Sequence, residues 1–319
     1  MANMLITGGA GCIGSELASK LLDIGNFVIV YDNMSSGKAE HIEGLLDNKN
    51  FEFIEGDILN FDMLKNVIKG SDIVFHMAAN PDIKYKEGDT TDKDLKQNVM
   101  GTYNVLEAMR INNIKKIVFS STSAVYGNAE IIPTPERYGP LKPTSLYGAS
   151  KLACEALISS YCYMFGFQAW IYRFANTIGS KNRKRGTMVI TDFIKKLREN
   201  KNELEILGNG LQEKSYMLID DCIDGMLFGI NNAKEKVNIL NLSPGDSISV
   251  NEIAKIIIEE IGLFNVKIKY TGGEQGWLGD VPKSALSSKK MEKLGWKARY
   301  NSEQSVRAAA KSMLGGDNQ

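Results

Sequence analysis

Short apolar runs alternate with longer stretches of helical spacing in the first half of the chain. The apolar runs cover residues 4–7, 27–32, 51–56, 73–77, 117–121 and 169–173. The stretches with helical spacing cover residues 14–22, 61–68, 92–110 and 145–165. Strands that alternate with helices in this way are typical of βαβ units. The pattern therefore predicts an α/β fold with a doubly wound parallel sheet of the Rossmann type.

The pattern becomes less regular after Arg173. Helical spacing recurs over residues 189–199, 221–231, 250–261 and 302–313, without regular strands between these stretches. We therefore predict a Rossmann domain over residues 1–173 and a smaller, mixed domain over residues 174–319. The boundary is approximate, because residues 210–245 could contribute a further strand to the sheet of the first domain.

Composition and charge exclude several classes of partner. The 319 residues are 43% hydrophobic, which is enough for real cores. Lys and Arg number 38 and so do Asp and Glu, so no overall charge attracts nucleic acid or an anionic membrane. No apolar run approaches the roughly 20 residues of a membrane span. We predict neither a nucleic-acid partner nor a membrane partner.

The cysteines and histidines argue against a metal site. The four cysteines are widely spaced and form no CxxC pair, as expected of reduced thiols in the cytoplasm. With only His41 and His76 present, a histidine-rich metal site or a Ser-His-Asp triad is poorly supported. We predict a cytoplasmic protein without a metal, in which both histidines have structural roles.

A glycine-rich segment joins the first predicted strand to the first predicted helix. Gly8, Gly11 and Gly14 permit a tight turn in this segment. Their lack of side chains lets the backbone approach a pyrophosphate at the N-terminus of the helix, where Cys12 and Ile13 lie. The segment therefore predicts a dinucleotide site.

Asp32 indicates which dinucleotide is bound. It ends the second predicted strand, where a carboxylate accepts hydrogen bonds from the adenosine ribose and repels a 2′-phosphate. The sequence therefore predicts NAD rather than NADP. A second interpretation stays open, in which Asp32 only starts the turn at residues 33–37.

Tyr147 and Lys151 lie four residues apart, so a helix places the phenol and the ammonium on one face. A phenol has a pKa of about 10, and the adjacent cation is predicted to lower that pKa toward neutrality. Tyr138 and Lys142 have the same spacing, but Pro140 between them should prevent a helix. We therefore predict that Tyr147 is the catalytic base.

The chain resembles the extended short-chain dehydrogenases/reductases, and among them the nucleotide-sugar 4-epimerases of the UDP-galactose and UDP-N-acetylglucosamine type. The resemblance covers nearly the whole length. It rests on the segments TGGAGCIG, YDNMSSG, GDI at Gly56, HMAANP at His76, NVMGTYNVLEA at Asn98, SSTSAVYG, YGASK and RFANTIG at Arg173.

The resemblance implies a mechanism in which NAD is held tightly and recycled. Tyr147 would take the proton from the sugar 4-hydroxyl while a hydride leaves C4 for NAD. Lys151 would hold the nicotinamide ribose, and Thr122 would hydrogen-bond the 4-oxygen and relay its proton. A 4-keto sugar then rotates and receives the hydride on its other face.

The resemblance also implies further contacts to the cofactor. They are expected from Asn33, Ser35, Ser36, Gly37, Asp57, Ile58, Ala78, Ala79, Asn98, Ser120 and Phe174, besides Tyr147 and Lys151. Asp57 and Ile58 follow the third predicted strand and would border the adenine. A turn aspartate with no contact to the cofactor would look similar at position 57.

Two residues after Thr122 separate the predicted reaction from related ones. Sugar 4,6-dehydratases carry Asp-Glu at these positions, because the elimination of water needs an additional acid and base. Decarboxylating relatives carry a glutamate at the second position. This chain has Ser123 and Ala124 there, which favours simple oxidation and return.

Substrate contacts are expected from residues in both halves of the chain. They are Thr122, Tyr147, Asn176, Val189, Lys214 and Ser284. Lys214 stands where many relatives place an arginine for the diphosphate, and Trp277 replaces a second such arginine. Ser284 is small where a bulky residue restricts the pocket beside C2, which predicts room for an N-acetyl group.

Besides the disfavoured 4,6-dehydratase, two other functions stay open on the sequence alone. A reductase would consume external NADH or NADPH on a keto-sugar, and a noncatalytic regulator would bind NAD without turnover. The set of Thr122, Tyr147 and Lys151 argues against the regulator. The resemblance also implies a homodimer formed through the helices at 92–110 and 145–165.

Overall fold

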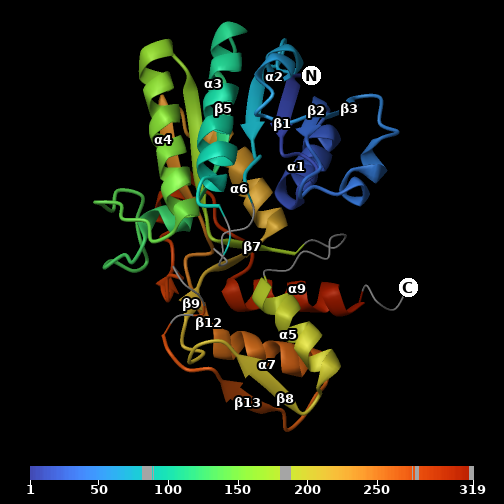
Figure 1. Cartoon of the computed structure of the whole chain (residues 1–319), viewed down its shortest axis with the longest axis vertical. Helices are drawn as coiled ribbons and strands as arrows, with labels where there is room; N and C mark the ends of the chain where they lie inside the picture. Colours follow the sequence, from blue (N-terminus) through green and yellow to red (C-terminus); the bar gives the residue numbers. More distant parts are fainter. Residues whose placement is uncertain (81–87, 89, 180–187, 275, 277–279, 316–319) are drawn as a thin grey trace. The chain divides into compact units, whose positions relative to one another are not determined.

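The computed structural model describes residues 1–80, 88, 90–179, 188–274, 276 and 280–315 (Figure 1). The chain forms two compact units, and it crosses between them repeatedly. The first unit contains residues 1–125, 146–173 and 229–240, and the second contains residues 126–145, 174–228 and 241–319.

A seven-stranded sheet forms the centre of the first unit, in the order β11-β6-β5-β4-β1-β2-β3. Its strands are β1 (Asn3–Thr7), β2 (Phe27–Asp32), β3 (Phe51–Glu55), β4 (Ile73–His76), β5 (Lys116–Thr122), β6 (Gln168–Phe174) and β11 (Val237–Leu242). The neighbours from β3 to β5 in this order pair in parallel. The predicted doubly wound fold is confirmed.

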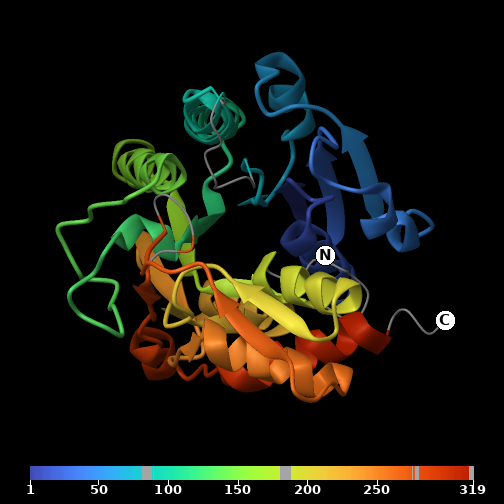
Figure 2. The same cartoon turned by 60° about the horizontal axis from the view of Figure 1, so that its bottom comes forward.

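Several α-helices of the described residues pack with this sheet. They are α1 (Cys12–Asp23), α2 (Phe61–Val67), α3 (Gly101–Ile111) and α4 (Leu146–Phe165). The helices α3 and α4 run side by side (Figures 1 and 2), and the Tyr161 hydroxyl on α4 donates to the Glu107 carboxylate on α3. Apolar side chains from both helices and from the sheet share one core, in which Phe119 and Phe167 are fully buried.

One predicted helix differs from the structure. The sequence predicts a single helix over residues 92–110, but residues Leu95–Met100 form a π-helix that precedes α3. In these wider turns the Asn98 side chain donates to Ser150 Oγ at 2.8 Å and to Asp94 Oδ1 at 3.1 Å. Apolar spacing alone does not reveal such a turn, because the periods of the two helix types are close.

The second unit contains short strands and longer helices. Its strands are β7 (Asn176–Ile178), β8 (Glu203–Ile206), β9 (Glu213–Lys214), β10 (Tyr216–Leu218), β12 (Ile248–Ser249), β13 (Lys267–Tyr270) and β14 (Lys283–Ser284). Its helices are α5 (Met188–Glu199), α6 (Ile219–Asn232), α7 (Val250–Ile261), α8 (Lys289–Leu294) and α9 (Ser302–Gly315). The last turn of α6 belongs to the first unit.

The helix α7 shows how local sequence sets these elements. Ser249 and Glu252 form a capping box at its start, and Gly262 ends it with a φ of 77°. Its buried residues share a core with α5 and α9. Among the described residues no helix combines the length and apolarity needed to span a membrane.

Candidate active site

The glycine-rich segment forms a close turn between β1 and α1. Gly8 has a φ of +70°, and a side chain there would collide with the backbone of Ala78, which follows β4. A side chain on Gly14 would collide with the carbonyl of Gly8. The strand order reverses between β1 and β4, which is where open α/β sheets bind ligands.

The start of α1 fits a pyrophosphate. Gly11 is the N-cap residue, and the helix begins with Cys12 and Ile13. Because glycine has no side chain, no capping side chain occupies the N-terminus of the helix. Backbone N–H groups in the first turn have no acceptor within the helix, and the helix dipole favours an anion there. The turn therefore suits the predicted dinucleotide.

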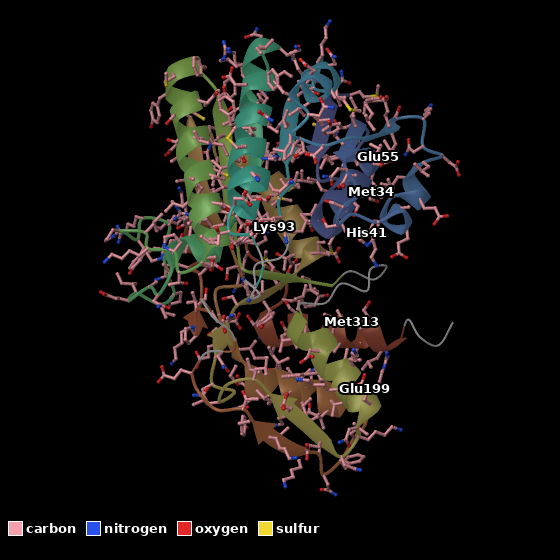
Figure 3. The ribbon with its side chains drawn as sticks, in the orientation of Figure 1. Met34, His41, Glu55, Lys93, Glu199 and Met313 are labelled. Atoms are coloured by element: carbon pink, nitrogen blue, oxygen red, sulfur yellow. The ribbon has the colours of Figure 1, made fainter. Side chains whose placement is uncertain are left out.

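Asp32 braces the turn at the end of β2. One carboxylate oxygen accepts from the Ala10 N–H at 2.9 Å and the other accepts from the Met34 N–H at 2.9 Å. His41 Nδ1 lies 2.8 Å from the Ala10 carbonyl, so Ala10 is held from both sides. Figure 3 labels Met34 and His41 in the segment after β2. Both predicted interpretations of Asp32 are compatible with these contacts, because each oxygen keeps a second lone pair.

The residues predicted to border the adenine hold one another. Asn33 Nδ2 donates to the Asp57 carboxylate at 2.9 Å, and the other Asp57 oxygen accepts from the Leu59 N–H at 2.8 Å. Ser35 Oγ donates to Asn33 Oδ1 at 2.6 Å. Ser35 and Ser36 are exposed, and Gly37 lies beside Asp32. Ile58 is buried against Gly101 of α3, within the hydrophobic core.

Asn98 links the segment after β4 to the catalytic helix. Its side-chain oxygen accepts from the Asn80 N–H at 2.8 Å, and its amide donates to Ser150 Oγ. Ser150 Oγ in turn donates to the Tyr147 carbonyl at 2.8 Å. Ala78 and Ala79, which are half-buried, directly precede Asn80. This chain of contacts joins the end of β4 to the first turn of α4.

The predicted catalytic side chains meet at the end of β5. Tyr147 lies in the first turn of α4, and its side chain hydrogen-bonds the side chain of Thr122, the last residue of β5. Lys151 is one turn further along and is buried. Its Nζ donates to the Ser120 carbonyl at 2.7 Å and lies 5.9 Å from the centroid of the Tyr147 ring.

The predicted direction of the Tyr147 pKa is wrong for the protein on its own. Burial raises the pKa of Tyr147 to about 12, and the negative charge of Asp94 raises it further, while the hydrogen bond from Thr122 lowers it. Burial also lowers the pKa of Lys151 to about 8. Burial disfavours the charged form of each group, so a buried phenol and a buried ammonium both favour their neutral forms.

His76 is a residue whose contacts the sequence did not reveal. Its Nδ1 lies 2.7 Å from Thr7 Oγ1 and its Nε2 lies 3.0 Å from Thr102 Oγ1. Thr102 Oγ1 donates to the Cys154 sulfur at 3.2 Å, so it accepts from Nε2. Burial and the charge of Lys151 lower the pKa of His76 to about 3. His76 is therefore a neutral, structural histidine between β1 and α4.

The second YxxxK match does not form a helix. Residues 138–142 are irregular, with a bend at Pro140 and an isolated β-bridge at Lys142, and the bond between Gly139 and Pro140 is cis. The Tyr138 hydroxyl accepts from the Glu130 N–H at 3.2 Å. The predicted effect of Pro140 is therefore confirmed.

The second unit brings two of the predicted substrate residues together. Lys214 on β9 and Ser284 on β14 are partners in a parallel pair. Lys214 Nζ lies 2.5 Å from Asp280 Oδ1, and the Asp280 side chain is 5% exposed. Trp277 lies outside the described residues.

The other predicted residues of the second unit lie apart from this pair along the chain. Asn176 begins β7, and its N–H donates to the Ser215 carbonyl at 3.1 Å. Val189 lies in the first turn of α5 and is half-buried, and Phe174 ends β6 and is buried. Each of these residues therefore lies within a helix or a strand, which fixes the position of its backbone.

Residues 4–243 of the chain match the NAD dependent epimerase/dehydratase family. The chain belongs to this family. The match spans the glycine turn, the end of β5 and the helix α4. Membership of the NAD dependent epimerase/dehydratase family confirms the predicted resemblance, the NAD cofactor and the enzymatic nature of the chain.

Three proteins similar to this chain are described as enzymes that act on UDP-sugars. A protein described as a UDP-glucose 4-epimerase from Methanocaldococcus jannaschii is 34% identical over 308 residues, which cover 95% of this chain and 96% of that one. A solved UDP-galactose 4-epimerase is 36% identical with a TM-score of 0.86, and the match covers 99% of this chain and 100% of that one. A UDP-N-acetylglucosamine 4-epimerase from Methanobrevibacter ruminantium, in complex with UDP-N-acetylmuramic acid, is 27% identical with a TM-score of 0.83, and the match covers 99% of each chain.

Proposed function

We propose that this chain interconverts UDP-N-acetylglucosamine and UDP-N-acetylgalactosamine by inversion at C4, and that it also accepts UDP-glucose and UDP-galactose. The observation that carries the reaction type is the hydrogen bond between Thr122 and Tyr147 beside the buried Lys151. The descriptions of the three similar proteins support a UDP-sugar as the substrate.

The side chains at the end of β5 divide the proton chemistry between them. Thr122 holds the sugar 4-oxygen, and Tyr147 takes the proton from it and later returns that proton. The Lys151 ammonium stabilises the phenolate from beside the ring. NAD bound at the glycine turn would accept a hydride from C4 and later return it.

The absence of carboxylates limits the reaction to oxidation and return. Ser123 and Ala124 directly follow Thr122, and the Ala124 N–H donates to Thr122 Oγ1 at 3.2 Å. Neither residue is able to act as the acid or base that the loss of water or carbon dioxide requires. This argues against the dehydratase and decarboxylase alternatives.

The choice of sugar is proposed from the second unit. Ser284 pairs with Lys214 in the sheet, so the small side chain lies beside the proposed diphosphate contact. A serine leaves room for an N-acetyl group at C2, where a large side chain would fill that space. We therefore propose that the first unit binds NAD and that Asn176, Val189, Lys214 and Ser284 bind the UDP-sugar.

A homodimer in the cytoplasm is part of the same proposal. Large apolar side chains are exposed along the π-helix, α3 and α4, including Met100, Tyr103, Tyr163 and Met164. Exposed apolar groups of this size are typical of protein interfaces. All four cysteines lie in the described part of the chain and none of them is in a disulfide, which supports a reducing compartment. Light scattering at several concentrations measures the mass, and a monomer at all of them would refute the dimer.

A panel of nucleotide sugars tests the proposed function. Purified protein is incubated with UDP-, GDP- and dTDP-sugars, and the products are separated while the NADH absorbance is followed. We expect conversion of the N-acetylated UDP-sugars without net change in NADH. A reductase would consume added NADH, and a noncatalytic regulator would convert none of the sugars.

A further inference from the structure

Three consecutive residues at the end of β5 contact residues of α4 that lie one turn apart. The contacts join Ser120 to Lys151, Ser121 to Glu155 and Thr122 to Tyr147. Residues four apart share one face of a helix, so α4 presents this set to a single strand end. The family resemblance assigns roles to the first and third contacts, and the second contact has none.

The second contact belongs to a buried ionic cluster. Ser121 Oγ donates to Glu155 Oε1 at 2.5 Å, and both residues are buried. Arg173 on β6 binds the same carboxylate with two nitrogens, Nε to Oε1 at 3.0 Å and Nη2 to Oε2 at 2.6 Å. A buried ion pair pays a desolvation cost that roughly offsets its attraction, so stability alone does not account for it.

We propose that Glu155 is a positioning residue for the reaction, because it fixes the end of β5 against α4 through Ser121. Thr122 directly follows Ser121, so its distance to Tyr147 depends on where the strand end is held. The inference rests on the proposed function only in that Thr122 and Tyr147 carry the proton step.

Glu155 has a second, electrostatic effect through its position one turn after Lys151. Burial lowers the pKa of Lys151, and Glu155, Asp94 and Cys154 act in the opposite direction. The neutral His76 and the Tyr147 ring also face this ammonium. Arg173 on β6 binds the Glu155 carboxylate with two nitrogens, so the negative charge of that carboxylate is shared between Arg173 and Lys151.

The positioning role is tested first with Ser121→Ala. The substitution removes one buried hydroxyl and leaves the Glu155–Arg173 pair in place. We expect kcat to fall about tenfold with KM unchanged, because the loss affects the alignment of the proton step and not the binding of substrate. Ser160→Ala is the matched control: Ser160 is exposed on the same helix and donates to its own helix at Ala156.

A second measurement does not depend on any substrate. In protein labelled with 13C at the tyrosine Cζ atoms, the Tyr147 resonance is identified by its loss in Tyr147→Phe. We expect Ser121→Ala to shift this resonance, because the hydrogen bond from Thr122 changes, and Ser160→Ala to leave it in place. An unshifted resonance together with an unchanged kcat would overturn the positioning role.

The electrostatic effect is tested by the pH dependence of kcat. The reaction needs Lys151 charged, so activity falls as the pH rises through its pKa. Glu155→Gln keeps an oxygen for Ser121 but removes the charge, and we expect the alkaline limb to move to lower pH. Arg173→Met removes the cation that shares the negative charge of Glu155, and we expect the alkaline limb of the kcat profile to move to higher pH.

A double variant keeps the test possible if these single substitutions prevent folding. Glu155→Met with Arg173→Met replaces the ion pair by apolar side chains, which proteins commonly tolerate. We expect its alkaline limb to lie below that of the wild type. If the alkaline limb of the kcat profile coincides with that of the wild type in every folded variant, the electrostatic effect is overturned. If the wild type converts no UDP-sugar, the proposed function fails, while the Tyr147 resonance still decides the positioning role.

Discussion

The ammonium of Lys151 lies 5.9 Å from the centroid of the Tyr147 ring, and it donates its hydrogen bond to the Ser120 carbonyl. The ammonium thus lies over the Tyr147 ring, and we propose that it acts on the phenol through its charge. Thr122 alone hydrogen-bonds the phenol side chain among the groups that affect its pKa. In the proposed mechanism Thr122 aligns the phenol and Lys151 stabilises the phenolate during the proton step.

Tyr147→Phe should lower kcat by a factor on the order of 10³, because the proton of the 4-hydroxyl then has no base within the site. Tyr138→Phe is the matched control, because Tyr138 belongs to the second YxxxK match, outside a helix. Steady-state kinetics on both variants checks this. Retention of full turnover by Tyr147→Phe would remove Tyr147 from its assigned role.

The buried Lys151 should make stability depend on pH. Its pKa falls from 10.5 to about 8 on folding, so the unfolded chain binds more protons between these values and stability rises with pH across that range. The tyrosine phenol, with a folded pKa of about 12, acts in the opposite direction only above pH 10. The free energy of unfolding of the wild type should therefore rise between about pH 8 and pH 10 relative to Lys151→Met.

Chemical denaturation at several pH values measures this difference. The size of the effect over the full shift from 10.5 to about 8 is at most about 3.5 kcal/mol, at about 1.4 kcal/mol for each pKa unit. A constant difference between the wild type and Lys151→Met across this range would show that Lys151 titrates normally.

Lys214→Met should weaken the binding of UDP about tenfold, because one cation at the proposed diphosphate contact is lost. It also leaves the buried Asp280 without the ion pair that the structure shows. Lys283→Met is the matched control, since Lys283 is on the neighbouring strand and its side chain is 62% exposed. Titration calorimetry compares the variants, and equal losses in both would argue against a specific contact.

Ser284→Tyr should reduce turnover of the N-acetylated UDP-sugars while it spares UDP-glucose and UDP-galactose. A large side chain would fill the space that the N-acetyl group needs beside C2. The ratio of kcat/KM for the two pairs, measured in the wild type and in the variant, checks this prediction. An equal loss on both pairs would refute the proposed gate.

Much of the fold could be predicted because its elements carry regular patterns. Residues 4–6 of β1 and all of β2 except Asp32 form apolar runs, and α7 carries its apolar residues at helical spacing between Ser249 and Gly262. The π-helix at Leu95–Met100 and two-residue strands such as β9 and β14 could not be predicted, because they have no period of their own.

The candidate site divides in the same way. The glycines, Asp32 and Tyr147 could be proposed from local sequence, since each lies at the end of a predictable strand or at the start of a predictable helix, and Thr122 could be proposed from the family resemblance. The contacts of His76 and Glu155 could not, because their partners lie far away in sequence. The direction of the Tyr147 pKa also depends on burial, which only the folded chain determines.

The fate of the hydrogen on C4 tests the central claim most directly. UDP-N-acetylglucosamine that carries deuterium at C4 is incubated with the protein in the absence of added NADH, and the isolated product is analysed by mass spectrometry and NMR. Oxidation and return at C4 predict UDP-N-acetylgalactosamine that keeps the deuterium at C4. Product that has exchanged its deuterium for solvent hydrogen, or no interconversion of any UDP-sugar, would contradict this account.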